Sequence, residues 1–557
     1  MQFTAMVSND TSGVTWSVNG TPGGSSTVGT IDANGNFTAP AVTQNATATI
    51  TATSKKDTTK SGTATATVIA PGVVAATANA QVASYTITVP DGLNVLVQLG
   101  PDTNYGLVTS APLAPSGGGS VTILVAGMRA NTAYHMRAVF QSNSQTVFND
   151  ADHTFTTTSY PAASLPSLTT TTATGMTPQS GVELLNLISI SGGAKLNSVV
   201  TDLNGNVIWA YDPGPLPGGA VPTLIKLLPN GHLLVLDGIG GGVDGTGSIF
   251  QEVDLAGNVV WQMTAAQLNA ALAAATCAGC NITVVGAHHD FAILPNGHLI
   301  IIAAEQVSES GLSGEPDPIT VTGDVIIDLD QNHNPVWLWS EFDHLDLNRH
   351  PMQFPDWTHT NSVVYSPSDH DLIVSMRHQA WVIKIDYNDG QGTGNILWKL
   401  GYQGDFTLVN GTDPVDWFNA QHDANVISDN SNGIFQLTMF DNGNQRVLDS
   451  SGTLCGATPC ASRVPLLQLD ESAKTATIEW VDDLAPVFSF FGGNSRLLAN
   501  GNIEFAEAAP TMPPVQTAAI FEVTKTTPPQ QVWQMQISGQ YCYRGTRIPS
   551  LYPGVQW

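Results

Sequence analysis

The chain has 557 residues, too many for one domain of ordinary size, and its 18 Lys and Arg against 45 Asp and Glu give a net charge of −27. This negative charge argues against nucleic acid or an anionic membrane surface as a partner. Charged residues make up only 11%, whereas Gly (53) and Pro (33) are abundant, which favours strands and turns over helices. No run of about 18 apolar residues is present, so no membrane-spanning helix is expected. We therefore expect an all-β protein.

Two small β-sandwich domains are expected at the start of the chain. Residues 1–70 alternate apolar and polar positions, and their stretch 29–40 resembles bacterial Ig-like repeats of secreted proteins. Residues 72–158 repeat the pattern, and the strand Ala133–Val139 resembles the late strand of a fibronectin type III module. The segment 159–178 is rich in Ser, Thr and Pro and is interpreted as a linker.

From residue 179 onward a repeat decides the expected fold. One unit is a strand, a turn and a strand ending in Trp, plainest in residues 200–209 and 253–261. The Trp residues that end the six copies of this unit lie about 50 to 80 positions apart. They are Trp209, Trp261, Trp337, Trp398, Trp480 and Trp533. A second hairpin around Pro-Asn-Gly, as in residues 227–236, completes four strands per repeat. This predicts a six-bladed β-propeller over residues 179–557, because a long β-solenoid, the competing interpretation, needs shorter periods.

Three consecutive blades carry a histidine at the same place in their first strand. These residues are His289, His359 and His422, and the equivalent positions in the first and fifth blades are Thr223 and Gly493. The innermost strands of a propeller line its central channel, and the same end of each strand faces the same mouth. We therefore expect the three histidines to converge near the axis.

Two further residues are expected at the same mouth. Antiparallel pairing brings Arg377, on the returning strand, level with His359. Asn361, two positions beyond His359, points to the same face of its strand. His288 is a rival to His289 for the inward position, since alternation along a strand lets only one of the two face the axis. The blade alignment favours His289.

Imidazoles, an amide and a guanidinium around a channel mouth suit a tetrahedral oxyanion such as sulfate or phosphate. One imidazole could act as a nucleophile while the others stabilise the charge that develops during transfer. Three histidines could instead bind zinc, although Arg377 beside them would repel a metal ion. Histidines that only pack the channel are the other alternative. We expect no metal and no cofactor at this site.

The segments around these residues resemble one enzyme family. They are residues 288–298, 356–362, 375–379, 421–424 and 440–446. The family is the bacterial arylsulfate sulfotransferases, six-bladed propeller enzymes preceded by a β-sandwich, and the resemblance covers roughly residues 180–557. It implies transfer of a sulfuryl group from an aryl sulfate to a phenol, without 3′-phosphoadenosine phosphosulfate, through a sulfohistidine intermediate and with ping-pong kinetics.

By motif, the resemblance implies that His422 is the nucleophile and that His289, His359, Asn361 and Arg377 hold the sulfuryl oxygens. It further implies small aryl sulfate and phenol substrates and a homodimer. A non-catalytic extracellular binding or adhesion protein is an alternative function, because propellers often bind ligands without chemistry. An aryl sulfate hydrolase is a second alternative.

Other aromatic, histidine and acidic residues are assigned to the site or to the surface by their position along the predicted strands and turns. The candidates for holding the aryl ring near the mouth are Trp357, Trp381, Tyr543 and Tyr552. The histidines interpreted as turn or surface residues are His232, His298, His333, His344, His350, His370 and His378. Asp290 and Asp423 each follow an inward histidine, so we expect them to face away from it and to be solvated; a supporting role behind the histidines is the alternative.

The five Cys residues form two close pairs and a singleton, Cys542. We expect two short-loop disulfides, Cys277–Cys280 and Cys455–Cys460, formed in an oxidising compartment. A redox or metal half-site at Cys277 and Cys280 is the alternative, disfavoured as a metal site because no second CxxC occurs. The cysteine pairing, the module types and the resemblance together favour a periplasmic or secreted location.

Overall fold

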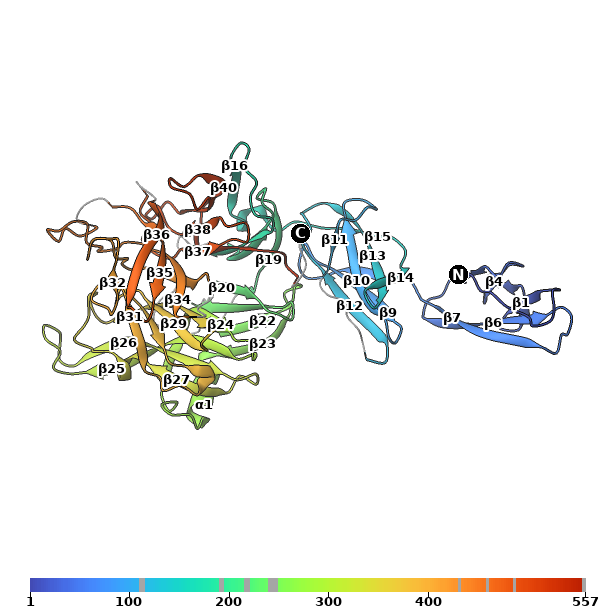
Figure 1. Cartoon of the computed structure of the whole chain (residues 1–557), viewed down its shortest axis with the longest axis horizontal. Coiled ribbons are helices and arrows are strands. Elements are labelled where there is room, and N and C mark those ends of the chain that lie inside the picture. The colour runs from blue at the N-terminus through green and yellow to red at the C-terminus, as the bar shows by residue number, and fades with distance from the viewer. Residues whose placement is uncertain are drawn as a thin grey trace. The chain divides into compact units, whose positions relative to one another are not determined.

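The computed structural model describes residues 1–109, 116–189, 195–214, 221–238, 249–428, 432–456, 460–483 and 487–552. Within these ranges the chain consists largely of antiparallel strands (Figure 1). It separates into two compact units, Met1–Thr158 and Ser159–Trp557. No helix of the described ranges combines the length and apolar character needed to cross a membrane.

The first part of the first unit is a pair of sheets with its own core. Its strands are β1 (Val14–Val18), β2 (Thr21–Pro22), β3 (Gly24–Ser25), β4 (Gly29–Ile31), β5 (Phe37–Thr38), β6 (Ala46–Ser54) and β7 (Ser61–Val68). They pair in the orders β2-β1-β6-β7 and β3-β4-β5. Both sheets contribute apolar side chains to one core, among them Val18, Ile31, Phe37, Ile50 and Val68. The alternation seen in the sequence therefore corresponds to strands with one buried face.

The second part of this unit repeats the arrangement. Its strands are β8 (Val73–Ala76), β9 (Ala83–Val89), β10 (Asn94–Gly100), β11 (Leu107–Val108), β12 (Gly119–Val125), β13 (Ala133–Ser142), β14 (Gln145–Asn149) and β15 (His153–Thr156). One sheet has the order β12-β9-β8, and the other has β11-β10-β13-β14 with β15 paired to β13. A separate core joins them through residues such as Tyr85, Val97, Leu99, Met136 and Phe140.

The described part of the second unit contains six sheets that follow one another along the chain. The strands of the first three are β20 (Val221–Leu227), β21 (Leu233–Gly238), β22 (Ile249–Val253) and β23 (Val259–Thr264); β24 (Val284–Ile293), β25 (Leu299–Glu309), β26 (Ile319–Leu329) and β27 (Pro335–Ser340); and β28 (Thr360–Ser366), β29 (Asp371–Met376), β30 (Trp381–Ile385) and β31 (Ile396–Leu400). Each is antiparallel and pairs in chain order. The sheets thus follow the hairpin repeat of the sequence.

The last three sheets depart from this simple order. Their strands are β33 (His422–Val426), β34 (Ile434–Phe440), β35 (Arg463–Asp470) and β36 (Thr475–Asp483), with β32 (Thr407–Leu408) parallel to β36; β37 (Asn494–Leu497), β38 (Ile503–Glu507), β39 (Thr517–Val523) and β40 (Gln531–Ser538); and β41 (Tyr541–Ile548), β17 (Val182–Ile188), β18 (Ser198–Thr201) and β19 (Val207–Tyr211). In the sixth sheet β41 pairs with β17, so the end of the unit joins its beginning.

The first strands of the six sheets lie side by side. β20 contacts β24, β24 contacts β28, β28 contacts β33, β33 contacts β37, β37 contacts β41, and β41 contacts β20. Residues far apart in the sequence therefore meet along these strands.

Part of the segment expected to be a linker belongs to the second unit. Residues Ser167–Thr172 form β16, which pairs along its length with β40 and adds a fifth strand to that sheet. The run of β-branched Thr residues favours this extended conformation. The short η1 (Ala162–Ser164) precedes it.

Helices are few and short among the described residues. α1 (Ala265–Ala274) is capped by Thr264, which forms a capping box with Gln267, and α2 (Glu341–His344) follows β27. A 3₁₀ turn, η3 (Asn388–Gly390), lies between β30 and β31.

The cysteines pair as expected. Disulfides join Cys277 to Cys280 and Cys455 to Cys460, while Cys542 is free and buried. The prediction of two short-loop disulfides is therefore confirmed, and the alternative of a metal half-site at Cys277 and Cys280 is wrong for this state of the chain.

Candidate functional site

The three histidines chosen from the sequence lie on neighbouring first strands and come together. His289 lies in β24, His359 directly precedes β28, and His422 begins β33. The ring centroids of His289 and His359 are 4.6 Å apart. The Tyr543 ring of β41 lies 6.0 Å from that of His289 and 6.1 Å from that of His422. The Tyr543 ring thus lies against His289 and His422, and His359 joins the group through its contact with His289.

Irregular strand pairing aims these side chains. The register shifts between Ala287 and Phe291 in β24, and between His422 and Asn425 in β33, as in a β-bulge. His289 and His359 have φ values of 59° and 52°, in the left-handed region that non-glycine residues rarely adopt. Bulges redirect side chains next to active sites, and such strained backbone persists only where the surrounding fold holds it.

Hydrogen bonds determine which nitrogen of His422 carries the proton. Nδ1 of His422 lies 2.6 Å from Oδ1 of Asn442. Asn442 uses its own Nδ2 to donate to the carbonyl oxygens of Ser489 and Gly492, so its Oδ1 can only accept. Nδ1 of His422 therefore donates, and Nε2 holds a lone pair. The Gly492 N–H donates a long bond of 3.3 Å to that Nε2, as this tautomer requires.

Arg377 lies beside His359, as the predicted antiparallel pairing of their strands requires. Its backbone N–H donates to the carbonyl oxygen of His359 over 3.1 Å, which confirms that the two residues are level. Its Nη1 donates to Nε2 of His378 over 2.6 Å, and its Nη2 donates to the carbonyl oxygen of Phe490 over 3.4 Å. The guanidinium thereby links β29 to the loop before β37.

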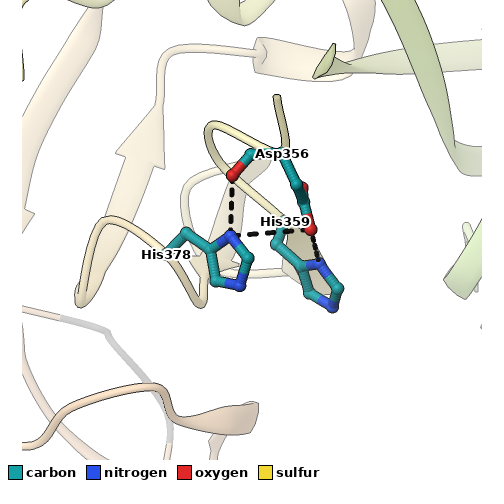
Figure 2. Close-up of side chains that lie close together, drawn as sticks. All are labelled: Asp356, His359 and His378. Atoms are coloured by element: carbon teal, nitrogen blue, oxygen red, sulfur yellow. Dashed lines mark hydrogen bonds and ion pairs between the residues drawn. The ribbon is translucent and has the colours of Figure 1, made fainter. Parts of the chain in front are cut away.

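Figure 2 shows how Asp356 orients two of the rings. Nδ1 of His359 donates to the Asp356 carboxylate over 2.5 Å, and Nδ1 of His378 donates to the Asp356 carbonyl oxygen over 2.8 Å. The two rings stack with centroids 4.5 Å apart. Asp356 therefore fixes both imidazoles through their Nδ1 atoms.

His288 and His289 both lie in the site region, which the alternation rule did not allow. Their rings meet edge to face at 4.8 Å, and their Nδ1 atoms are 2.6 Å apart. Only His289 of the two has a described ring contact with His359 and Tyr543, whereas His288 reaches Asp324 through Nε2 over 2.9 Å. The left-handed backbone at His289 breaks the strict alternation, so both side chains are buried in one network.

Asn361 acts on the neighbouring strand. Its Nδ2 donates to the carbonyl oxygen of Gln421, the residue before His422, over 2.7 Å. The backbone carbonyl oxygen of Asn361 accepts from Nη2 of Arg544 over 2.9 Å. Its Oδ1 is buried and has no hydrogen-bond partner within the described ranges. Asn361 therefore holds the start of β33 through its amide nitrogen.

The acids that follow the inward histidines are not solvated, so that expectation is wrong. Asp290 and Asp423 are each about 1% exposed, and each lies 3.2 Å from Nη1 of Arg544. Lys226 also contacts Asp290 at 2.6 Å, and Arg496 contacts Asp423. The first strands pack against one another, so the face turned away from the histidines meets neighbouring strands instead of water.

The site is buried and rich in donors. Burial, together with the positive charge of Arg377, holds the pKa of His422 well below its ordinary value, and burial with neighbouring imidazoles does the same for His289. For His359 the pKa is lowered by burial, His378 and Arg377. Among the described residues, Arg377 Nε and the Tyr543 hydroxyl are buried without hydrogen-bond partners. Neutral imidazoles beside unsatisfied donors suit an anion with several oxygens.

Comparison with known families identifies the second unit. Residues 170–544, more than half of the chain, match the family model for Arylsulfotransferase (ASST). The chain belongs to the arylsulfotransferase family. A comparison with curated proteins finds no match. Membership supports aryl sulfotransferase activity in general, with small-molecule substrates.

Solved structures resemble the chain only distantly. A member of the DUF4221 family from Bacteroides vulgatus is 6% identical, with coverage of 69% of this chain and 97% of that one and a TM-score of 0.29. A point variant of an ACO/RPE65 chimera is 10% identical, with coverage of 83% and 95% and a TM-score of 0.30. The WD40 domain of SCAP from fission yeast is 8% identical, with coverage of 84% and 85% and a TM-score of 0.20. Similarity at this level carries no argument about function.

One group in this arylsulfotransferase has the spacing of metal ligands. Potential ligand atoms of Asp356, His359 and His378 all lie within 4.8 Å of one another. Both Nδ1 atoms already donate to oxygens of Asp356, and Nη1 of Arg377 lies 2.6 Å from Nε2 of His378. A cation here would lie beside the guanidinium, which already occupies Nε2 of His378. The donor set therefore fits a hydrogen-bonded cluster better than a metal site.

Several residues of the arylsulfotransferase site are not predicted from the sequence. His378 is expected at the surface, but the turn from Arg377 to Ala380, with φ of 51° at Ala380, folds its ring onto His359. Asp356 and Asn442 lie inside the segments that carry the family resemblance, which was the available signal. Arg544 lies outside those segments, on the last strand, and no sequence signal pointed to it.

Of the four aromatic candidates, Tyr543 has described ring contacts with the site histidines. Trp357 packs against Phe342 and donates to the carbonyl oxygen of Arg349, and Trp381 lies under the Arg349 guanidinium. Tyr552 is buried near the end of the described chain. The structure therefore gives site contacts to Tyr543 and core positions to the other three.

Proposed function

We propose that the protein transfers a sulfuryl group from an aryl sulfate to a phenol by a ping-pong mechanism, with His422 forming a sulfohistidine. The observation that carries the proposal is the tautomer of His422, whose Nδ1 proton is held by Asn442 and whose Nε2 keeps a lone pair. A lowered pKa keeps this imidazole neutral and hence nucleophilic. The surrounding donors supply the charge stabilisation that a sulfuryl group needs.

In the first half-reaction, Nε2 of His422 attacks sulfur and the bond between sulfur and the aryl oxygen breaks. The weak bond from the Gly492 N–H gives way to the new N–S bond. Arg377 stabilises the negative charge on the sulfuryl oxygens, and the phenolate leaves. His289 and His359 line the site, with their Nδ1–H groups engaged by His288 and Asp356. Positioning and electrostatic stabilisation account for the acceleration, because little other covalent chemistry is required.

In the second half-reaction, a phenol oxygen attacks sulfur, the N–S bond breaks, and His422 returns to its neutral form. The acceptor loses one proton and the earlier leaving phenolate gains one, so the sum over both halves is balanced. Asn361 contributes by holding Gln421 and thereby the start of β33, and His288 contributes through His289.

An aromatic pocket is proposed at the same mouth. Phe490 and Phe491 are half-buried, pair edge to face at 5.0 Å, and adjoin Arg377 through the Phe490 carbonyl oxygen. The Tyr543 ring lies between His289 and His422. Such rings offer the faces and edges that an aryl group packs against.

The architecture supports the same proposal. The six sheets, the contacts between successive first strands and the pairing of β41 with β17 support a closed six-bladed propeller. The two sheet pairs of the first unit support Ig-like and fibronectin-III-like modules at 1–70 and 72–158. The two disulfides support a periplasmic or secreted location. A homodimer is proposed from the family resemblance alone.

The test is incubation with 4-nitrophenyl sulfate, with and without phenol. Sustained release of nitrophenolate only when phenol is present, with phenyl sulfate as product, supports the transferase. Sustained release without an acceptor would indicate a hydrolase, and no release would indicate a binding protein.

A matched pair of variants locates the nucleophile. His422→Ala is expected to abolish the initial burst of nitrophenolate and the mass increase of one sulfuryl group on the protein. The control is His370→Ala, which removes a half-exposed histidine from a surface turn and should retain both. A sulfuryl adduct that persists in His422→Ala would contradict the assignment.

A further inference from the structure

We propose that Asp324, His288 and His289 form a buried proton relay, in which His289 exchanges the phenolic proton with the substrates and His288 stores it beside Asp324. The proposal rests on the proposed sulfuryl transfer and deepens it. It assigns to His289 the role of general acid and base, which the transfer chemistry requires but which the family match leaves open.

The three groups form a continuous chain of short contacts. Oδ1 of Asp324 lies 2.9 Å from Nε2 of His288, and Nδ1 of His288 lies 2.6 Å from Nδ1 of His289. The side chains of His288 and Asp324 are 3% and 1% exposed, so water does not compete for these bonds. The His289 ring then faces His359 and Tyr543 in the centre of the site.

The contacts determine the tautomers. Nε2–H of His288 donates to the carboxylate, which leaves its Nδ1 as an acceptor when the ring is neutral. The Nδ1–H of His289 must then be the donor across the 2.6 Å contact. This places the lone pair of His289 on Nε2, the atom that is free to accept a proton from a phenol. A lowered pKa, caused by burial and by neighbouring imidazoles, keeps His289 neutral before the phenol arrives.

Asp324 is held as the anchor of this relay by groups on three other elements. Thr360 N–H and the Thr358 hydroxyl donate to its Oδ2, over 2.5 and 3.0 Å. Glu341 accepts from the Asp324 N–H, and burial together with the Asp324 charge raises the pKa of Glu341, so the negative charge rests on Asp324. The charged or titratable groups that face His289 are His359, His288, His422 and Arg544.

The proton balances over the cycle. As the phenol oxygen bonds to sulfur and the N–S bond to His422 breaks, the phenolic proton moves to Nε2 of His289. The Nδ1 proton of His289 passes to Nδ1 of His288, which becomes a cation paired with Asp324. In the next donor half-reaction the same transfers run in reverse, and the leaving aryl oxygen takes the proton. The positive charge is thus kept beside a carboxylate.

The relay is tested by comparing half-reactions in His288→Gln and Asp324→Asn. The burst with 4-nitrophenyl sulfate releases a stable phenolate, whereas transfer to phenol must remove a proton from the acceptor. Since general acid and base catalysis is worth about 10²- to 10⁴-fold, we expect both variants to slow transfer to phenol about 100-fold more than the burst. The solvent deuterium isotope effect on transfer to phenol should also differ between these variants and the unmodified protein.

Asp328→Asn is the matched control. Asp328 lies on the same strand, β26, and accepts from His298 at 3.0 Å and from the Tyr387 hydroxyl at 2.7 Å, away from the site. It should leave both half-reactions unchanged. A series of aryl sulfates with increasingly basic leaving groups gives a second test in the unmodified protein, where the relay predicts a weak dependence of the donor step on leaving-group pKa.

Three results would overturn the proposal. Equal slowing of burst and transfer in His288→Gln and Asp324→Asn would show a purely structural role. A normal burst together with normal transfer to phenol in both variants would overturn the relay alone. The absence of any burst in the unmodified protein would overturn the proposed sulfuryl transfer itself, and the relay with it.

Discussion

Asn442 fixes the protonation of His422, because its Oδ1 lies 2.6 Å from Nδ1 of that ring and can only accept a hydrogen bond. The amide is itself held by two backbone carbonyl oxygens, those of Ser489 and Gly492. The proposed nucleophile therefore has one tautomer and one orientation before substrate binds. In hydrolases with an equivalent arrangement, loss of the orienting group costs several orders of magnitude in rate.

The first prediction concerns this orienting bond. Asn442→Ala is expected to slow the burst with 4-nitrophenyl sulfate by about 10²-fold or more, because Nε2 of His422 is then protonated for part of the time. Rapid-mixing absorbance measures the burst. Asn258→Ala is the control, since Asn258 donates to Asp254 in an exposed turn and holds no histidine. Equal effects in both variants would refute the tautomer argument.

The second prediction concerns pH. The pKa of His422 is lowered from an ordinary value of 6.5 by burial and by Arg377, so its neutral form persists below pH 6.5. The burst rate should therefore stay constant as the pH falls through 6.5 and decline only at a lower pH. Arg377→Gln removes a positive neighbour, raises the pKa, and should move this decline to higher pH. An inflection at the ordinary value in the unmodified protein would contradict the assignment.

The third prediction concerns the guanidinium itself. Arg377→Lys keeps a positive charge but loses the planar fork that reaches both His378 and the Phe490 carbonyl oxygen. We expect kcat/KM for the aryl sulfate to fall about 10²-fold, as for loss of a donor that stabilises developing charge. Arg137→Lys in the first unit, where the guanidinium binds Gln98, should have no effect on steady-state turnover. Turnover unaffected by Arg377→Lys would rule out this role.

The fourth prediction concerns the buried ion pairs beneath the site. Arg544→Met leaves Asp290 and Asp423 without the cation they share, and removal of one partner of a buried ion pair costs about 3 to 5 kcal/mol of unfolding free energy. Urea unfolding of the second unit, followed by tryptophan fluorescence, measures the loss. Arg496→Met should cost less, because Arg496 is 27% exposed and Asp423 keeps Arg544. A larger loss for Arg496→Met would refute the central role of Arg544.

The fifth prediction concerns metal. Asp356, His359 and His378 are occupied by hydrogen bonds to one another and to Arg377. Prolonged dialysis against EDTA should therefore leave the burst and the transfer rate unchanged. Loss of activity that one added metal ion restores would show that the cluster binds a metal after all.

Local sequence rules predicted a large part of this protein. The alternation of the early strands, the Trp-ending hairpins and the Pro-Asn-Gly turns predicted the order of the sheets, because each pattern depends on residues close together in the chain. Antiparallel pairing placed Arg377 level with His359, and the backbone bond between them confirms it. The same rules selected His289, His359 and His422.

The sequence by itself determined which strands form and which histidines can meet, since period and pairing are local properties. Only the tertiary structure decided how those histidines are used. The left-handed backbone at His289 brings His288 into the same network, and the turn after Arg377 returns His378 to His359. Arg544 reaches Asp290 and Asp423 because β41 contacts the other first strands, a long-range relationship that no local pattern encodes.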